Sequence, residues 1–335
     1  MKKNKFCPNC QTKYKSSDFE FCKNCGAKLE EDYGENSLPG GIASSKKERH
    51  RTLASWNWVP AILGYAISFI LLFILQNILS VVGLLLGLQT WPVPVLIIYN
   101  VCYILFVYSP EFLVFVTLGS YGLLLVPFLY VKIKGLSIKE LGLDFTDKKE
   151  VQKDIAVGVL GGSIMMAISI FVSLLSSSLG YKLYSPFDLY LSDIFSTIGN
   201  APFMAMYPYQ YILLVLCMFL IVAPCEEIST RGFLQQGLEN SFGKWAGLII
   251  TAIIFSALHI ILYPQNAVGM GFPSYVGSIS AILAIPSYLA LSLTLGFLLQ
   301  IRKYRILTTI TAHAIYMTIL ISLYYVLNYW VYLYW

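Results

Sequence analysis

The chain has 335 residues, of which 57% are hydrophobic and only 12% are charged. A soluble globular domain is about one quarter charged, so this composition excludes an ordinary soluble protein and indicates a polytopic helical membrane protein. The net charge of +5 is unevenly spread, because nearly half of the 23 Lys and Arg residues precede position 52. Such clusters are typical of cytoplasmic loops, and we expect no nucleic-acid partner. The polar start of the chain also argues against a cleavable signal peptide.

Residues 1–30 contain two Cys-x-x-Cys pairs, Cys7 with Cys10 and Cys22 with Cys25. Four thiolates at this spacing predict a structural, tetrahedral Zn²⁺ site, and a segment this short needs such a staple to fold. Two disulfides are the alternative, but they require an oxidising compartment, which the predicted topology argues against. The pattern resembles small zinc-ribbon modules of prokaryotic membrane proteins. Because four thiolates leave no open coordination position, we expect a structural role or a docking site for a protein partner.

Residues 31–52 are predicted to be a flexible linker that ends in a basic juxtamembrane patch. The patch reads Lys-Lys-Glu-Arg-His-Arg over positions 46–51. A basic patch directly before an apolar segment is typical of a cytoplasmic membrane anchor. Nucleic-acid binding is the alternative, and the position beside the membrane argues against it.

Residues 53–335 are predicted to form an all-α transmembrane bundle of about seven to eight helices. The short apolar stretch 94–108 is an interfacial helix, a re-entrant helix or an eighth span. We favour seven spans, because that number places every basic cluster on one side of the membrane. The prediction is a multi-pass protein of the cell membrane with a cytoplasmic N-terminus. The seven expected spans cover residues 58–88, 110–130, 155–179, 211–238, 245–262, 274–300 and 306–330.

Two connections and one helix complete the predicted bundle. The basic loop at 135–154 is expected on the cytoplasmic side, and the loop at 180–209 on the opposite side. Gly158, Gly161 and Gly162 in the third span are expected to permit close helix packing.

The span at 211–238 carries two adjacent carboxylates and a guanidinium, Glu226, Glu227 and Arg231. An ionised group at bilayer depth costs ~2.5–3.5 kcal/mol on insertion scales unless it is paired or faces a cavity. Glu227 and Arg231 are four residues apart, which predicts an ion pair on one helix face and leaves Glu226 available. Pro224 is expected to kink or open this helix. A purely structural ion pair is the simpler interpretation, but it leaves Glu226 without a partner.

His259 and His313 both lie inside apolar spans, where imidazole needs a partner or a function. Either one alone is more simply a satisfied core histidine. Helical rise counted from the cytoplasmic ends, however, places both at a depth similar to that of Glu226. We therefore expect a shared site for water activation. Cys225 lies beside this site, but a buried thiol next to carboxylates is hard to ionise and is not expected to be a nucleophile.

Each residue of this cluster has an expected role. Glu226 would take a proton from water, and His259 would position that water or share its proton. His313 would donate to the developing oxyanion. Glu227 and Arg231 would brace each other, with Arg231 also a candidate to orient a substrate carbonyl or carboxylate. This chemistry is peptide hydrolysis without a Ser or Cys nucleophile.

Glu226-Glu227-x-x-x-Arg231, Phe255-x-x-x-His259 and His313 together resemble the three motifs of the CPBP family. This family comprises type II CAAX prenyl endopeptidases and Abi-like intramembrane proteases. The resemblance covers about residues 110–325 and implies an all-α intramembrane endopeptidase. It implies that Glu226 and His259 activate the attacking water, while third-motif residues stabilise the tetrahedral intermediate. It also implies membrane-associated peptide or protein substrates, including CAAX-like or lipidated ones.

The third motif of this family commonly reads His-x-x-x-Asn, whereas this chain has Met317. Met cannot donate a hydrogen bond, and loss of one oxyanion donor costs ~10²–10³ in rate. Either His313 suffices, or Thr311 or Tyr316 substitutes, or the protein is slow or inactive.

A catalytic metal and two other functions remain as alternatives. Two His and a Glu could ligate Zn²⁺, but His-Glu-x-x-His is absent, so we favour a glutamate-activated water without bound metal. The alternative function is a non-catalytic membrane scaffold or bacteriocin-immunity-type protein that binds a peptide in the same cavity. A proton-coupled transporter is a third interpretation, but the sequence has no internal repeat to support it.

Overall fold

The computed structural model describes residues 5–6, 13–14, 29–31, 54–86, 114–115, 117–178, 208–269 and 274–334. By its contacts the chain divides into two compact units, Met1–Arg49 and His50–Trp335. Several predicted features lie outside the described residues, so the predictions for them stay predictions. These features are the cysteines Cys7, Cys10, Cys22 and Cys25, the basic patch at 46–51, the stretch 94–108 and nearly all of the loop at 180–209.

The described part of the first unit is a small antiparallel sheet. It contains β1 (Lys5–Phe6), β2 (Lys13–Tyr14) and β3 (Glu30–Glu31), in the order β2-β1-β3. Lys5 pairs with Tyr14 on one side and with Glu31 on the other. The first Cys-x-x-Cys pair therefore belongs to the β1–β2 connection, and the second precedes β3. Strands this short are not stable by themselves.

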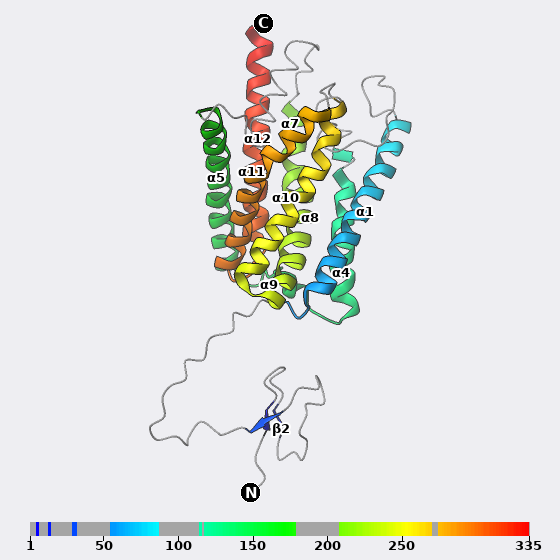
Figure 1. Cartoon of the computed structure of the whole chain (residues 1–335), viewed down its shortest axis with the longest axis vertical. Coiled ribbons are helices and arrows are strands. Elements are labelled where there is room, and N and C mark those ends of the chain that lie inside the picture. Colours follow the sequence, from blue (N-terminus) through cyan, green and yellow to red (C-terminus); the bar gives the residue numbers. More distant parts are fainter. Residues whose placement is uncertain are drawn as a thin grey trace. The chain divides into compact units, whose positions relative to one another are not determined.

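The described part of the second unit is helical, as predicted from the composition (Figure 1). Among the described residues, three helical stretches are long and apolar enough to cross a membrane, at 58–83, 148–172 and 208–242. Shorter apolar helical stretches cover 118–133, 244–259, 285–301 and 307–323. The helices coincide with the apolar segments of the sequence, while the number of spans stays a prediction. Their bounds are α1 (Trp58–Leu85), η1 (Leu118–Tyr121), α4 (Gly122–Ile133), η2 (Ile138–Leu141), α5 (Lys148–Ser178), α7 (Pro208–Cys217), η3 (Met218–Val222), α8 (Ala223–Glu227), η4 (Ile228–Gln235), α9 (Gln236–Phe242), α10 (Lys244–Gly269), α11 (Ser274–Ile301) and α12 (Leu307–Tyr334).

The helix that carries the paired carboxylates contains two π-helical segments. Both η3, just before Pro224, and η4, which contains Arg231, are π-helical, whereas α8 between them is α-helical. Pro224 cannot donate a backbone hydrogen bond, so the regular ladder is interrupted there. The predicted opening is present as the π-helical turn η3 directly before Pro224. The second π-helical turn, η4, lies after Pro224; such turns are frequent at functional sites.

The third expected span begins seven residues earlier than position 155, because a side chain caps it. The Oδ1 atom of Asp147 accepts the backbone N–H of Lys149 at 2.9 Å and that of Glu150 at 3.4 Å. This N-cap lets α5 start at Lys148, inside the segment predicted to be a loop.

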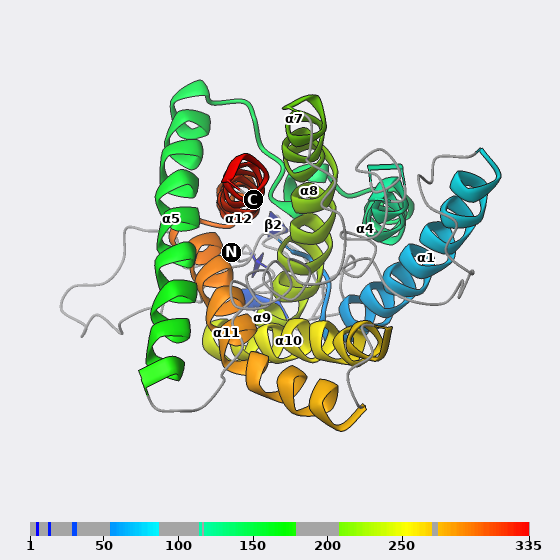
Figure 2. The same ribbon diagram turned by 90° about the horizontal axis from the view of Figure 1, so that it is seen from above.

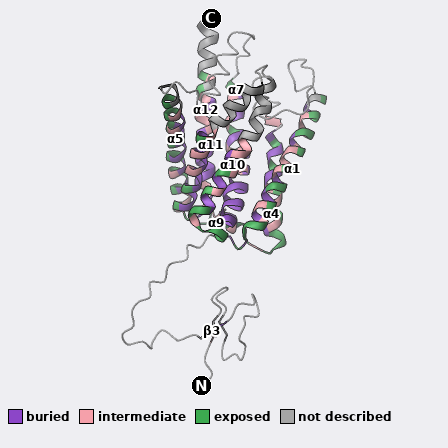
Figure 3. Ribbon diagram, viewed as in Figure 1, coloured by how far each residue is buried: buried purple, intermediate pink, exposed green. Residues whose placement is uncertain are grey.

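Glycines on α5 let it approach α12 closely. A Cβ atom at Gly158 would lie 2.5 Å from Cβ of Thr311, and one at Gly162 would lie 2.6 Å from the carbonyl oxygen of Ala312. The predicted close packing is confirmed, and α12 lies between α5 and α8 when seen from above (Figure 2). Buried residues follow the inner helices, while apolar side chains such as Ile67 and Ile70 on α1 are exposed, as expected for a lipid-facing surface (Figure 3).

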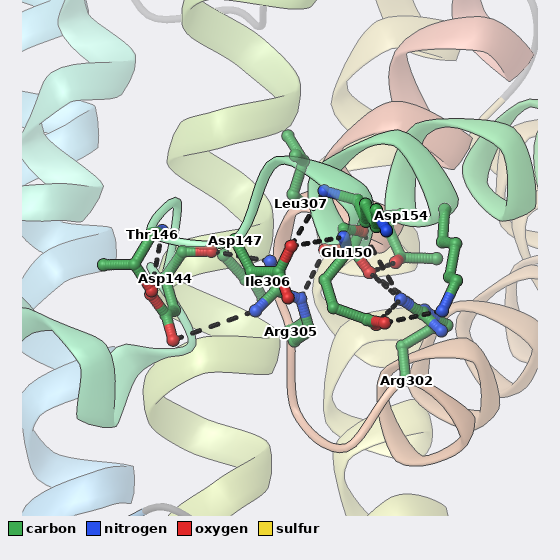
Figure 4. Close-up of polar contacts among 12 residues, drawn as sticks. Asp144, Thr146, Asp147, Glu150, Asp154, Arg302, Arg305, Ile306 and Leu307 are labelled. Atoms are coloured by element: carbon green, nitrogen blue, oxygen red, sulfur yellow. Dashed lines mark hydrogen bonds and ion pairs between the residues drawn. The ribbon is translucent and has the colours of Figure 1, made fainter.

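The start of α12 is fixed by a buried carboxylate on α5, Asp154 (Figure 4). Its Oδ1 atom accepts Nε of Arg302 at 2.9 Å and Oγ1 of Thr308 at 3.0 Å. Its Oδ2 atom accepts Nε of Arg305 at 2.5 Å. Asp154 has no exposed surface, so these three donors compensate its charge. The cluster ties α5, the α11–α12 connection and the first turn of α12 together.

Candidate active site

Glu227 is the centre of a buried ionic cluster that joins two motifs. Its Oε1 atom lies 3.0 Å from Nδ1 of His313 on α12, and its Oε2 atom lies 3.3 Å from Nε of Arg231. The side chain of Glu227 has no exposed surface. The predicted ion pair of Glu227 and Arg231 is therefore present, and the structure adds His313 as a second partner.

Arg231 extends the cluster to two further helices. One guanidinium nitrogen, Nη2, donates to Oγ of Ser292 on α11 at 2.9 Å, and the guanidinium carbon lies 5.1 Å from the ring centroid of Phe255 on α10. Arg231 is completely buried. Such burial favours the bracing role over direct contact with a substrate. Sequence reasoning missed Ser292, because a single Ser in an apolar helix carries no distinctive signal.

Glu226 differs from its neighbour in being accessible. Its side chain is 28% exposed, and its Oε2 atom lies 4.0 Å from Nε2 of His313. That distance is too long for a direct hydrogen bond, but one water molecule can bond to both atoms from beside the line that joins them. Among the described residues, none donates a hydrogen bond to this carboxylate. Glu226 is therefore free to act on a water molecule held against His313.

His259 is oriented by a hydrogen bond to its own helix. Its Nδ1 atom lies 2.9 Å from the carbonyl oxygen of Phe255, which can only accept, so Nδ1 carries a proton and Nε2 is the nitrogen left for another partner. The ring is held between Phe255 and Tyr288, with centroid distances of 4.2 and 4.8 Å. Four of the predicted residues, Glu226, Glu227, Arg231 and His313, thus form one cluster. His259 adjoins it through Phe255, whose ring contacts both His259 and the guanidinium of Arg231.

The donor set does not match a metal centre. In the part of the chain that the structure describes, no three His, Cys, Asp or Glu side chains are arranged to hold an ion. Both oxygens of Glu227 face His313 and Arg231 instead.

Neither substitute donor expected near Met317 points to this cluster. The hydroxyl group of Thr311 donates to the carbonyl oxygen of Leu307 in its own helix at 2.8 Å. The hydroxyl group of Tyr316 lies 3.0 Å from Oγ of Ser169 on α5. Met317 itself packs against apolar side chains. Cys225 is a free, buried thiol in one of these apolar clusters, as expected.

A second buried polar network lies one to two turns further along the same helix. The carboxylate of Glu239 accepts from Nε2 of Gln235, from Nε2 of Gln300 and from the hydroxyl group of Tyr304, each at 2.7 Å. This network links α9 to the end of α11. The Gln-Gln-x-x-Glu pattern after Arg231 could have predicted this network, because it places polar side chains on the buried face of the helix.

A family model described as type II CAAX prenyl endopeptidase Rce1-like matches residues 208–319. The match covers about a third of the chain and contains Glu226, Glu227, Arg231, His259 and His313. No curated protein and no solved structure matches the chain. The match supports the CPBP resemblance, a membrane location and the activity of a CAAX-type intramembrane protease.

Proposed function

We propose that this chain is an intramembrane endopeptidase in which Glu226 activates the attacking water. The observation that carries the proposal is the 4.0 Å separation between Oε2 of Glu226 and Nε2 of His313 beside the buried brace of Glu227 and Arg231. This geometry supports a water molecule shared by an accessible carboxylate and an oriented imidazole. The family match supports peptide bonds of CAAX-type substrates as the target.

The reaction follows from these groups. Glu226 takes a proton from the water as its oxygen attacks the scissile carbonyl carbon, and the lone pair on Nε2 of His259 helps to orient that water. His313 acts as an imidazolium, which donates its Nδ1 proton to Glu227 in a hydrogen bond and its Nε2 proton in a hydrogen bond to the oxyanion that forms. Glu226 then returns the proton to the amine nitrogen as the C–N bond breaks. Glu227 does not contact the water; it accepts the hydrogen bond from Nδ1 of His313, which sets the ring orientation, and it pairs with Arg231.

The test compares wild-type protein with the Glu226→Gln variant in detergent micelles. The probe is a farnesylated, internally quenched peptide with a CAAX end, and its unprenylated counterpart reports whether the lipid matters. We expect cleavage by the wild type and a loss of ~10²-fold or more in the variant, since proton transfer to the carboxylate is removed. Equal cleavage by both proteins would refute the proposal.

Met317 supports a second candidate function, a non-catalytic scaffold or immunity-type protein. Its side chain packs in apolar clusters where the family commonly has a donor. A membrane-associated peptide would then bind at the same site without being cleaved. A cellular phenotype that survives both Glu226→Gln and His259→Ala would favour this function, and its loss in both variants would favour the protease.

The first unit is proposed to be a zinc ribbon that docks a protein partner on the cytoplasmic side of the cell membrane. The antiparallel β1–β2 connection, which contains the first Cys-x-x-Cys pair, supports this proposal. The basic clusters of the sequence support the orientation. The zinc would be structural, with Cys7, Cys10, Cys22 and Cys25 as its four ligands.

A further inference from the structure

Tyr65 on α1 is a buried tyrosine that lies outside the segment 208–319 matched by the family model. It contacts the helix at 208–242 that carries Glu226, Glu227 and Arg231, here called the motif helix. Its hydroxyl oxygen accepts a hydrogen bond from Oγ1 of Thr230 at 3.2 Å, and the side chain is 5% exposed. Thr230 directly precedes Arg231. Thr230 also lies four residues after Glu226 on the same helix. An element that neither the motifs nor the family match includes therefore places a hydroxyl group beside the segment that carries Glu226, Glu227 and Arg231.

Close packing fixes the position of α1 on this helix. A Cβ atom at Gly64 would lie 2.6 Å from the ring of Phe233, and one at Gly237 would lie 2.5 Å from Cβ of Ala61. Both approaches lie within two turns after Thr230 and leave α1 little freedom to slide. The hydroxyl group of Tyr65 is therefore held in place and is not a mobile surface group.

The proton of Tyr65 is available for donation. A phenol has one proton, and the hydrogen bond from Thr230 occupies an acceptor site on the oxygen. Within the described ranges, no residue accepts the phenol proton. A hydroxyl group that accepts one hydrogen bond also becomes a better donor.

Hydrolysis at this site requires a second hydrogen-bond donor to the oxyanion. Met317, at the position where the family commonly has Asn, provides none. Thr311 and Tyr316 are each bonded elsewhere. We infer that Tyr65 donates a hydrogen bond to the oxyanion formed at the site of Glu226 and His313, in place of the amide that Met317 replaces. The inference rests on the proposed function, and it identifies α1 as part of the substrate-binding wall.

The test compares turnover of the farnesylated CAAX peptide by four proteins. They are the wild type, Glu226→Gln as the inactive reference, Tyr65→Phe, and Tyr316→Phe as the control. Tyr316→Phe also removes the hydroxyl group of a buried tyrosine, but one bonded to Ser169. We expect Tyr65→Phe to lower kcat by ~10²–10³-fold with little change in KM, because the donor acts on the transition state. Tyr316→Phe should keep kcat within about twofold.

A second pair of variants decides the question if Tyr65→Phe does not fold. Thr230→Val removes the hydrogen bond that orients the phenol, whereas Thr230→Ser retains it. We expect kcat to fall about tenfold in the Val variant and to stay near the wild-type value in the Ser variant, the loss of one hydrogen bond being worth about that factor.

The outcomes separate the two proposals. Wild-type activity that equals that of Glu226→Gln would overturn the proposed function and the role of Tyr65 with it. Wild-type activity well above that reference, combined with an unchanged kcat in Tyr65→Phe, would overturn the role of Tyr65 alone. Equal kcat values for Thr230→Val and Thr230→Ser would also overturn it.

Discussion

Glu227 and His313 are 86 positions apart in the chain, yet Oε1 of one lies 3.0 Å from Nδ1 of the other. This contact joins the first and third motifs and is made by the buried carboxylate of the adjacent pair. Its neighbour Glu226 faces the opposite ring nitrogen of the same imidazole from a partly exposed position. His313 therefore lies between a fully buried glutamate and a partly exposed one.

Substitution by Gln should lower the stability of the protein at Glu227 but not at Glu226. Glu227→Gln leaves the fully buried Arg231 without its counter-charge, and breaking a buried pair costs ~3–5 kcal/mol. Glu226→Gln changes an accessible group and should alter stability by less than about 0.5 kcal/mol while abolishing cleavage. Apparent Tm values in one detergent measure the difference. Similar Tm losses in the two variants would contradict this assignment.

Asp154 should be essential for the stability of the α5–α12 packing. Asp154→Asn removes the charge that compensates Arg302 and Arg305, and we expect a loss of ~3–5 kcal/mol in the free energy of unfolding. Glu150→Gln is the matched control, because Glu150 also pairs with Arg302 but is 33% exposed and should cost less than about 1 kcal/mol. Thermal unfolding of both variants tests the ranking. A larger loss for Glu150→Gln would refute it.

The turn that leads into α5 should loosen in acid. Hydrogen bonds from the hydroxyl group and backbone N–H of Thr146, together with Lys139, lower the pKa of Asp144 to about 2. A carboxyl group whose pKa is lowered by folding stabilises the folded state fully above its unfolded pKa of ~3.9 and loses that contribution as the pH falls towards its folded pKa. Amide hydrogen exchange of residues 138–147, corrected for its intrinsic pH dependence, should accelerate between about pH 4 and pH 2. Asp144→Asn should remove this step, and its persistence would assign it to another group.

Trp56 should stabilise the motif helix from outside the motifs. Its Nε1 atom donates to the carbonyl oxygen of Phe233 at 2.9 Å, and the two rings stack with centroids 5.1 Å apart. Trp56→Phe keeps an aromatic ring but removes one of two hydrogen bonds to that carbonyl, which also accepts the backbone N–H of Gln236, and this should cost ~0.5–1.5 kcal/mol. Trp58→Phe, at a position 43% exposed, should cost less than about 0.5 kcal/mol. Apparent Tm values of the two variants check the contrast, and equal shifts would contradict it.

Removal of the predicted zinc should affect the folding of the first unit and leave the activity of the second unit unchanged. Cys7→Ser, or treatment with a chelator, should unfold the first unit, because its short strands cannot stand alone. Cleavage of the farnesylated peptide by the second unit should be unchanged. Zinc content and peptide turnover measure the two effects. A loss of turnover in a protein whose membrane unit keeps its Tm would give the first unit a direct role in catalysis.

The sequence predicted contacts that depend on spacing within one helix. The pair of Glu227 and Arg231 follows from the four-residue repeat, and the opening near Pro224 follows from the missing N–H group. Contacts between helices were harder to predict. In a membrane helix both the lipid-facing and inward faces are apolar, so periodicity does not show which way a helix is turned. The contacts of Tyr65 with Thr230 and of Trp56 with Phe233 depend on that rotation.

Trp56 lies before α1 but contributes to the stability of the second unit. Trp56 precedes α1, and its backbone carbonyl accepts Nδ2 of Asn240 at 2.8 Å while its side chain covers the π-helical turn. A chain shortened to start at His50 would retain Trp56, whereas one shortened to the first residue of α1 would lose the indole donor to the carbonyl of Phe233 and the acceptor of Asn240. Proteolytic release of the first unit would therefore leave the packing of the helical unit intact only if the cut fell upstream of Trp56.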